Sequence, residues 1–184
     1  AGAGSGALSC SLLRAIGPNG RLFSFERRED FAEIAAANVL KFFGETQTTW
    51  SLTTGDLVES LPESEAAAGV DRVVLDMLAP WECVDMAAKV LRPGGVFLAY
   101  VATTTQLSAT AEALKEDGRF TEPESSETLV RGWHHEGLAV RPEHRMISHT
   151  GFLVRSRRVA DGVAAMRKRR RPSKPGEEDL LDQE

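Results

Sequence analysis

Strand-like and helix-like segments alternate along most of this 184-residue chain, and this alternation limits its fold more than any other feature. Apolar or β-rich runs typical of strands occur at 21–26, 48–54, 71–77 and 96–102. Apolar residues at helical spacing occur at 7–16, 30–43, 80–91 and 106–116. Two later strand-like stretches, 120–140 and 149–159, are separated by glycine, proline and polar residues. The pattern predicts an α/β fold: a doubly wound, Rossmann-like sheet with an antiparallel C-terminal strand pair.

Breaker residues and charge divide the chain. Gly17-Pro18-Asn19-Gly20 ends the first predicted helix, and Arg92-Pro93-Gly94-Gly95 is predicted as a turn. We expect one domain over residues 1–160. Residues 161–184 combine a basic run, prolines and an acidic end, so we expect a disordered tail there.

The chain opens with Ala-Gly-Ala-Gly-Ser-Gly, a glycine loop of the kind that normally follows a buried strand. We therefore expect that this sequence is a fragment that lacks its N-terminal strand. That strand would lie at the centre of the sheet, so we also expect that the fragment does not fold or act alone.

Composition indicates a soluble, intracellular protein. No run of 18 apolar residues could span a membrane, and no charged-then-apolar leader is present. Cys10 and Cys83 lie in apolar, helix-like patterns, so we expect buried free thiols in a reducing cytoplasm.

The net charge of -5 is unevenly distributed. Residues 167–184 hold six basic and five acidic residues, a tail of +1, which leaves -6 for the body. Within that body, residues 131–158 hold six arginines against two glutamates, and all four histidines. A polyanion could bind this segment, although a solvated edge with scattered ion pairs would have the same composition.

The loop Gly2-Ala3-Gly4-Ser5-Gly6 precedes a predicted helix. Glycines let a ligand approach the backbone, and the free N–H groups at a helix start attract an anion. The GxGxG spacing differs from the GxGxxG of dinucleotide sites and suits S-adenosylmethionine, with its carboxylate near those N–H groups. The alternative is a glycine-rich turn that binds no ligand.

Acidic residues end the next two predicted strands. Glu26 is placed to accept hydrogen bonds from both hydroxyls of a ribose, and Asp56 to accept one from an adenine amino group. Phe31 could pack on that adenine or in the core. An exposed strand-end carboxylate and an ordinary turn aspartate are the alternatives. Because the carboxyl ends of parallel strands share one edge, these positions are expected to converge on a single crevice.

Asp76 ends the apolar strand at 71–77, in a loop that Pro80 restricts. A carboxylate there could orient a nucleophile by accepting its N–H hydrogen bond. Alternatively, Asp76 caps the helix that begins at Pro80. Trp81 could be either a core residue or a stacking platform.

These motifs resemble, in order, those of class I S-adenosylmethionine-dependent methyltransferases. The resemblance rests on the glycine loop, Glu26, Asp56, Leu75-Asp76 with Pro80-Trp81, and Arg92–Gly95. Over residues 1–160 the chain is more specifically similar to the tRNA adenine-N1 methyltransferases that modify position 58 in the T-loop. Arg27–Phe31, Arg131-Gly132-Trp133 and, above all, His149–Val154 carry that similarity.

The resemblance implies a seven-stranded methyltransferase domain preceded by a small β-rich domain, which is missing here, and a cytoplasmic homotetramer. It implies methyl transfer from S-adenosyl-L-methionine to N1 of adenine 58 of tRNA, with Asp76 as the catalytic residue. The implied cofactor-binding residues are Gly2, Ala3, Gly4, Ser5, Gly6, Ala7, Leu8, Glu26, Arg27, Phe31, Gly55, Asp56, Leu57 and Asp76. The implied substrate-binding residues are Arg131, Arg145, His149 and Arg155.

Other interpretations remain open. His149 could be a structural hydrogen bonder, and the basic run 167–171 could bind RNA or only aid solubility. The histidines lack cysteine or carboxylate partners at ligand spacing, so no metal site is expected. The same sheet could methylate a small molecule or a protein, or it could serve as a non-catalytic subunit; intact Asp56 and Asp76 argue against the last.

Overall fold

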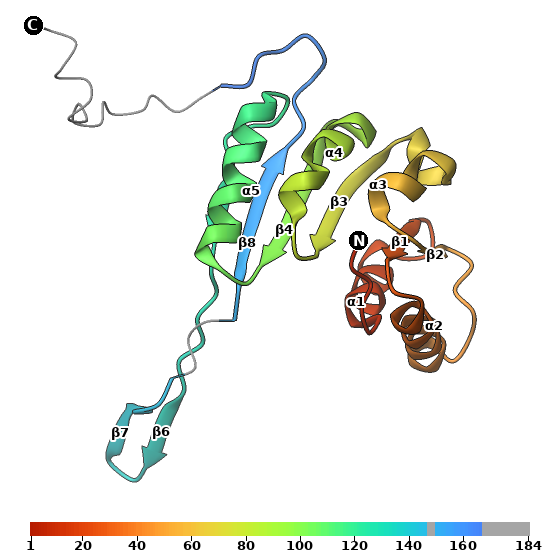
Figure 1. Cartoon of the computed structure of the whole chain (residues 1–184). Helices are drawn as coiled ribbons and strands as arrows, with labels where there is room; N and C mark the ends of the chain where they lie inside the picture. Colours follow the sequence, from red (N-terminus) through yellow and green to blue (C-terminus); the bar gives the residue numbers. More distant parts are fainter. Residues whose placement is uncertain (147–149, 167–184) are drawn as a thin grey trace, which may run out of the picture.

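The computed structural model describes residues 1–146 and 150–166, and it confirms the alternation of strands and helices (Figure 1). The strands are β1 Leu22–Glu26, β2 Trp50–Thr54, β3 Val70–Asp76, β4 Leu91–Val101, β5 Glu124–Ser126, β6 Trp133–Glu136, β7 Ala139–Pro142 and β8 Phe152–Arg157. The helices are α1 Ala7–Ile16, α2 Glu29–Phe43, α3 Leu57–Ser60, α4 Val84–Val90 and α5 Thr104–Asp117. Three short 3₁₀ helices, η1 Leu61–Glu63, η2 Glu65–Ala68 and η3 Pro80–Cys83, complete the order.

Among the described residues, the strands form a mixed four-stranded sheet in the order β3-β4-β8-β5 and two separate pairs, β1-β2 and β6-β7. β1 pairs with β2 and β3 pairs with β4, both parallel. β8 lies antiparallel between β4 and β5. The antiparallel C-terminal strand pair predicted from the sequence is therefore confirmed.

Residues 1–3 join the β1–β2 pair to the rest of the sheet. The Gly2 N–H donates to the Phe25 oxygen of β1 at 3.0 Å. On the other side, the Ala1 nitrogen donates to the Val74 oxygen at 2.7 Å, and the Asp76 N–H donates to the Ala1 oxygen at 3.0 Å. The start of the described chain thus lies between β1 and β3.

Helix ends follow local chemistry. α5 begins with a capping box between Thr103 and Gln106, which satisfies amide groups that the first turn leaves unpaired. α2 ends at Gly44, whose φ of 75° is the left-handed conformation that glycine adopts without strain. α1 ends at Gly17, whose N–H donates to the Leu13 oxygen.

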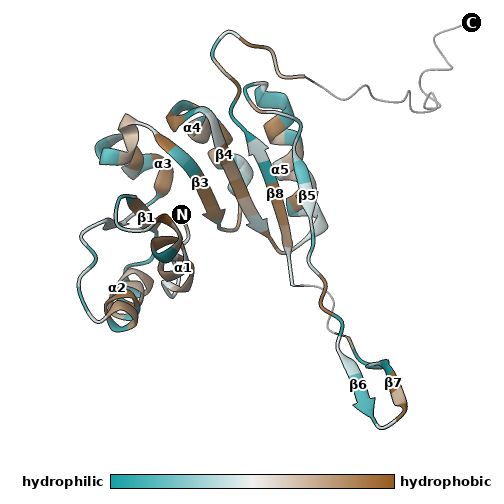
Figure 2. Cartoon of the chain, turned by 180° about the vertical axis from the view of Figure 1, so that it is seen from behind, coloured by the Kyte–Doolittle hydropathy of each residue, from teal (hydrophilic) through white to brown (hydrophobic). Residues whose placement is uncertain are grey.

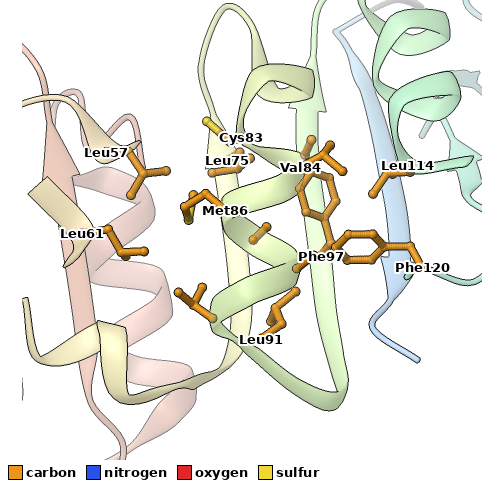
Figure 3. Close-up of a cluster of buried hydrophobic side chains, with 14 of the residues drawn as sticks. Leu57, Leu61, Leu75, Cys83, Val84, Met86, Leu91, Phe97, Leu114 and Phe120 are labelled. Carbon is orange, nitrogen blue, oxygen red and sulfur yellow. The ribbon is translucent and has the colours of Figure 1, made fainter. Parts of the chain in front are cut away.

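The core lies between the helices and one face of the β3–β4–β8 sheet. Leu75, Phe97, Ala99 and Val154 are fully buried in this core. Figure 3 shows Leu75 and Phe97 together with Val84 and Met86 of α4 and Leu114 of α5. Phe97 packs edge-to-face on Phe120, with ring centroids 5.7 Å apart. The alternate residues along these strands point to the other face, which no helix of the described chain covers in Figure 2.

Two segments next to each other in the chain, at and after α4, differ from the prediction. The single helix predicted over 80–91 is a 3₁₀ turn, Pro80–Cys83, followed by α4. The turn predicted at Arg92–Gly95 is instead part of β4, where it forms an irregular bulge between the pairs Val70↔Leu91 and Arg72↔Val96. Hydrogen bonds to Arg158 hold Gly94 and Gly95 in the sheet, and tertiary pairing of this kind overrides local turn chemistry.

The C-terminal part also differs in detail. The strand-like stretch 120–140 contains β5 and, beyond it, the hairpin of β6 and β7, which turns at Gly137 and projects from the sheet (Figure 1). The strand predicted over 149–159 is the shorter β8. The loop predicted after residue 56 holds α3, η1 and η2. The predicted tail, including the basic run 167–171, lies largely outside the described residues.

Both cysteines are buried free thiols, as predicted. Among the described residues, no helix is both long enough and apolar enough to cross a membrane.

Candidate active site

The glycine loop, residues 2–6, packs tightly against two neighbouring segments. A Cβ on Gly2 would overlap the Asp76 carbonyl oxygen, and one on Gly6 would lie 2.9 Å from the Ala35 oxygen. Gly2 and Gly6 also have φ of 77° and 83°, so only glycine fits without strain. Gly4 differs, because the nearest atom to its Cβ position is the Gly2 oxygen at 3.9 Å. The loop is thus fixed at both ends and open at its middle.

The start of α1 offers unpaired amides beside this loop. The first residues of α1 are Ala7 and Leu8, both predicted to bind the cofactor, and no side chain caps this helix. The Asn38 amide donates to the Ser5 oxygen at 2.9 Å and ties the loop to α2. Free N–H groups at the start of a ten-residue helix favour an anion such as a carboxylate.

Glu26, at the end of β1, carries a buried carboxylate, and only 7% of the residue's surface is exposed. Its Oε2 accepts the Gly4 N–H at 2.8 Å, and its Oε1 accepts the Arg28 N–H at 3.1 Å. An ionised carboxylate has about four acceptor positions, so each oxygen keeps one for a ligand. Glu26 therefore sits directly under the open middle of the glycine loop.

Arg27 and Phe31 were both predicted to contact the cofactor. Phe31 is half-buried, and Arg27 is exposed. The guanidinium of Arg28, which the sequence did not single out, stacks 3.4 Å above the Phe31 ring centroid. This cation–π contact covers one face of the Phe31 ring, and the sequence spacing alone does not distinguish Arg28 from Arg27.

The loop after β2 approaches Glu26. The Gly55 N–H donates to the Glu26 carbonyl oxygen at 2.8 Å. Asp56 caps α3, since its Oδ1 accepts the Val58 N–H at 2.9 Å, as the turn-aspartate interpretation expected. Asp56 Oδ2 makes no hydrogen bond within the described residues and can accept one from a ligand. The Leu57 side chain lies in the core, which leaves only its backbone for such a contact.

Asp76 is the last residue of β3, and its backbone adjoins both Ala1 and Gly2. It does not cap the following helix: the N-cap of η3 is Ala79, with no side-chain hydrogen bond, so that alternative is wrong. Its exposed side chain is in register with Tyr100 of β4 and Leu153 of β8. The carboxylate thus stands at the sheet edge where the glycine loop, β1 and β3 meet.

Cys83 lies near this edge, and its surroundings disfavour the thiolate. Burial raises the pKa of the Cys83 thiol, and the negative charge of Asp56 raises it further. Its Sγ lies 3.8 Å from the Met77 sulfur. A neutral, buried thiol is a poor nucleophile, so covalent cysteine chemistry does not fit this site.

The donor set at this edge fits an adenosyl cofactor that carries a carboxylate. The bare backbone at Gly4 accommodates close approach, and the uncapped amides of α1 suit the carboxylate. Glu26 has acceptor capacity for a ribose diol. No group of three potential metal ligands occurs within residues 1–146 and 150–166.

The predicted substrate-binding residues do not gather at one place, unlike those of the cofactor site. Arg155 lies in β8 and forms an ion pair with Glu124 of β5. The β6–β7 hairpin lies away from the sheet (Figure 1). Arg131 and Arg145, both exposed, flank this hairpin along the chain. His149 lies outside the described residues. Ser126, Leu153, Tyr100 and Asp76 form one register row, so the hairpin segment leaves the sheet at the edge that holds Asp76.

Two further residues of this edge were not singled out from the sequence. The Tyr100 hydroxyl donates to the Thr150 oxygen, and Gly151 packs against its ring. The Gln106 side chain reaches the loop that follows Asp76. The Thr103-x-x-Gln106 spacing could have revealed the helix cap, but only the tertiary structure shows this second contact.

Comparisons with known proteins agree with this geometry. A family model described as "tRNA methyltransferase complex GCD14 subunit" matches residues 1–137. The chain is 32% identical over 181 residues to the tRNA (adenine(57)-N(1)/adenine(58)-N(1))-methyltransferase TrmI of Methanocaldococcus jannaschii, covering 85% of this chain and 62% of that protein. It is 34% identical over 158 residues to the tRNA (adenine(58)-N(1))-methyltransferase TrmI of Thermus thermophilus, covering 86% and 60%. The chain therefore spans about three fifths of the length of these relatives.

Solved structures show the same fold. A tRNA (m1A58) methyltransferase TrmI from Aquifex aeolicus superposes with a TM-score of 0.71 and 26% identity, over 86% of this chain and 60% of that one. A SAM-dependent O-methyltransferase from Thermotoga maritima gives 0.72 and 31%, over 85% and 57%. With the family model matching well over half of its residues, this chain belongs to the GCD14 family of tRNA methyltransferase complex subunits and has the class I methyltransferase fold.

Proposed function

We propose that this chain is the methyltransferase domain of a tRNA (adenine-N1)-methyltransferase that modifies adenine 58 of the T-loop with S-adenosylmethionine. The observation that carries this proposal is the convergence of the glycine loop, Glu26 and Asp76 on one sheet edge. The names of the relatives from Methanocaldococcus jannaschii and Thermus thermophilus support the substrate class.

The cofactor would supply an activated methyl group, and the residues of the glycine loop and strand ends would hold it. Glu26 would accept hydrogen bonds from the ribose hydroxyls with the acceptor positions that Gly4 and Arg28 leave free. Asp56 would accept one from the adenine amino group through Oδ2. The remaining cofactor-binding residues named from the resemblance stay predictions.

Asp76 would act on the substrate base. It would accept an N–H hydrogen bond from the exocyclic amine of adenine, which aligns N1 for attack on the methyl group. It would also stabilise the positive charge that develops on the base as N1 is methylated. N1 carries no proton in neutral adenine, so Asp76 orients and stabilises and does not need to act as a general base.

The β6–β7 hairpin and its flanks would hold tRNA. The target base must leave the folded T-loop to enter a pocket, and phosphate contacts then hold the rest of the RNA. Arg131 and Arg145 are exposed on the segment that leaves β5 and β8 at the same end of the sheet as Asp76, which supports a phosphate-binding role. Arg155 is already paired with Glu124, so its contribution would require exchange of that partner.

In the whole protein, we propose a doubly wound sheet of seven strands, preceded by a small β domain, in a cytoplasmic homotetramer. Residues 1–3 bond to both β1 and β3, which supports a strand at that place in the sheet. The hairpin exposes Trp133, Leu138 and Val140, and an isolated two-stranded hairpin is at best marginally stable in water. Contact with another subunit would cover it. Buried free thiols suit the cytoplasm.

The direct test uses labelled S-adenosylmethionine, unmodified tRNA and nucleoside analysis of the product. We expect label in 1-methyladenosine with the wild-type protein and loss of that label in Asp76→Ala. A protein that binds the cofactor firmly but leaves tRNA unlabelled would contradict the tRNA proposal.

A second candidate is methylation of a small molecule, favoured by the similarity to the Thermotoga maritima structure named an O-methyltransferase. The same cofactor site would serve that reaction, which would not need the exposed arginines. Phosphate contacts make RNA binding fall steeply with salt, whereas binding of a neutral small substrate would not change.

A further inference from the structure

The Gln106 side chain connects the two loops that leave adjacent parallel strands at the Asp76 edge. Its Nε2 donates to the Leu78 oxygen at 2.9 Å, in the loop after β3. Its Oε1 accepts the backbone N–H groups of Ala102 and Thr103, at 3.2 and 3.1 Å, in the loop after β4. One amide thus bridges both loops.

Helix capping accounts for only half of this arrangement. In the capping box of α5, Gln106 needs only an acceptor oxygen, and its backbone N–H donates to Thr103 Oγ1 at 3.2 Å. Glutamate serves that role as well as glutamine. Only the amide, however, has a donor for the Leu78 carbonyl. The bond from Nε2 therefore acts on the Asp76 loop and is not required by the helix.

The bridged loop carries an exposed apolar side chain. Leu78 follows Asp76 by two residues and is 80% exposed, while Pro80 just beyond it is buried. A single exposed leucine is ordinary on a protein surface. Here it stands on a short segment anchored at Asp76, at Pro80 and through the Gln106 amide, beside the candidate catalytic carboxylate.

We propose that Gln106 is a positioning residue, which holds the loop so that Leu78 provides an apolar contact for the substrate's ring next to Asp76. The inference rests on the proposed methyl transfer to a nucleobase. A base that has left its stack needs apolar surface in the pocket as well as hydrogen bonds. Since a displacement of about 1 Å can reduce a rate by about 100-fold, loss of the one side-chain bond that holds the middle of this loop is expected to affect turnover more than stability.

The test compares Gln106→Glu, Leu78→Ala and Thr103→Ala in the same protein. Gln106→Glu keeps the acceptor for the cap and loses the donor to Leu78. We expect kcat for tRNA methylation to fall about tenfold or more, with the cofactor Kd unchanged and Tm within about 4 °C of wild type. Thr103→Ala removes the cap and the hydroxyl contact with Gln106 Oε1, but it leaves the Nε2 bond to Leu78 in place. It is therefore expected to lower Tm while kcat at a permissive temperature is retained.

A double-mutant cycle separates positioning from a general structural role. If Gln106 acts through Leu78, Gln106→Glu should add little to the kcat loss of Leu78→Ala. Leu78→Ala is also expected to weaken binding of unmodified tRNA, measured by fluorescence anisotropy. Wild-type kcat in Gln106→Glu, or losses that multiply in the double variant, would overturn the inference. Failure of wild type to methylate tRNA would instead overturn the proposed function.

Discussion

Replacing Glu26 with glutamine removes the charge at the centre of the candidate cofactor site without changing its shape. The carboxylate accepts two backbone N–H groups, from Gly4 at 2.8 Å and from Arg28 at 3.1 Å. A glutamine has one acceptor oxygen, so its NH₂ must face one of these donors. The loss of a hydrogen bond to a charged, buried group costs about 1.5–3 kcal/mol.

A loss of about 2 kcal/mol lowers Tm by about 4–8 °C in a protein of this size. The cofactor loses a charged acceptor for its ribose hydroxyls, so we expect its Kd to rise by about 10- to 100-fold, which corresponds to about 1.4–2.7 kcal/mol. Thermal unfolding and calorimetric titration with S-adenosylmethionine measure the two effects. Glu29→Gln is the matched control, because Glu29 is exposed in the first turn of α2 and its loss should cost about 0.3–1 kcal/mol at most.

If Glu26→Gln matched Glu29→Gln in both Tm and cofactor affinity, the role assigned to the buried carboxylate would be wrong. A fall in Tm with unchanged affinity would assign Glu26 to the loop alone and would remove it from the cofactor site.

Three further outcomes follow from the structure. Gly6→Ala should destabilise the protein by several kcal/mol more than Gly4→Ala, as urea unfolding would show. The Gly6 Cβ would lie 2.9 Å from the Ala35 backbone oxygen, whereas the Gly4 Cβ would lie 3.9 Å from its nearest atom. Gly4→Ala should cost about 1–2 kcal/mol for its left-handed backbone. The raised pKa of Cys83 keeps its thiol protonated, so alkylation of Cys83 at pH 8 should be slow in the folded protein and fast in urea. The contribution of Cys83 to folding stability should fall as pH rises above the pKa of the thiol in the unfolded chain. Rapid labelling of the folded protein would argue against burial. Arg131→Ala should reduce the salt dependence of log Kd for tRNA by about one unit of slope, and an unchanged slope would exclude a phosphate contact.

Much of the cofactor edge could be predicted because it depends on chain order. Glu26 and Asp76 end apolar strands, and parallel strands that end at the same edge must bring those residues together. The glycine loop could be recognised because backbone with positive φ and close packing admits no other residue. The proposed roles of these residues toward cofactor and base stay predictions.

Contacts between loops could not be predicted, since they depend on distances across the fold. Arg28 and not Arg27 stacks on Phe31, because the turn after β1 directs only one of two adjacent arginines toward the ring. The turn expected at Arg92–Gly95 became part of β4, because the backbone of Arg158, which follows β8, hydrogen-bonds Gly94 and Gly95 and ties them to the sheet.

The sequence by itself determined the order of strands and helices, the glycine loop and the acidic strand ends, because these depend on periodicity and on local backbone chemistry. Only the tertiary structure decided which face of the sheet the helices bury, where the β6–β7 hairpin projects and that the Gln106 amide reaches Leu78. Such contacts join residues far apart in the chain, and they form only after the burial of the core has brought β3, β4 and α5 together.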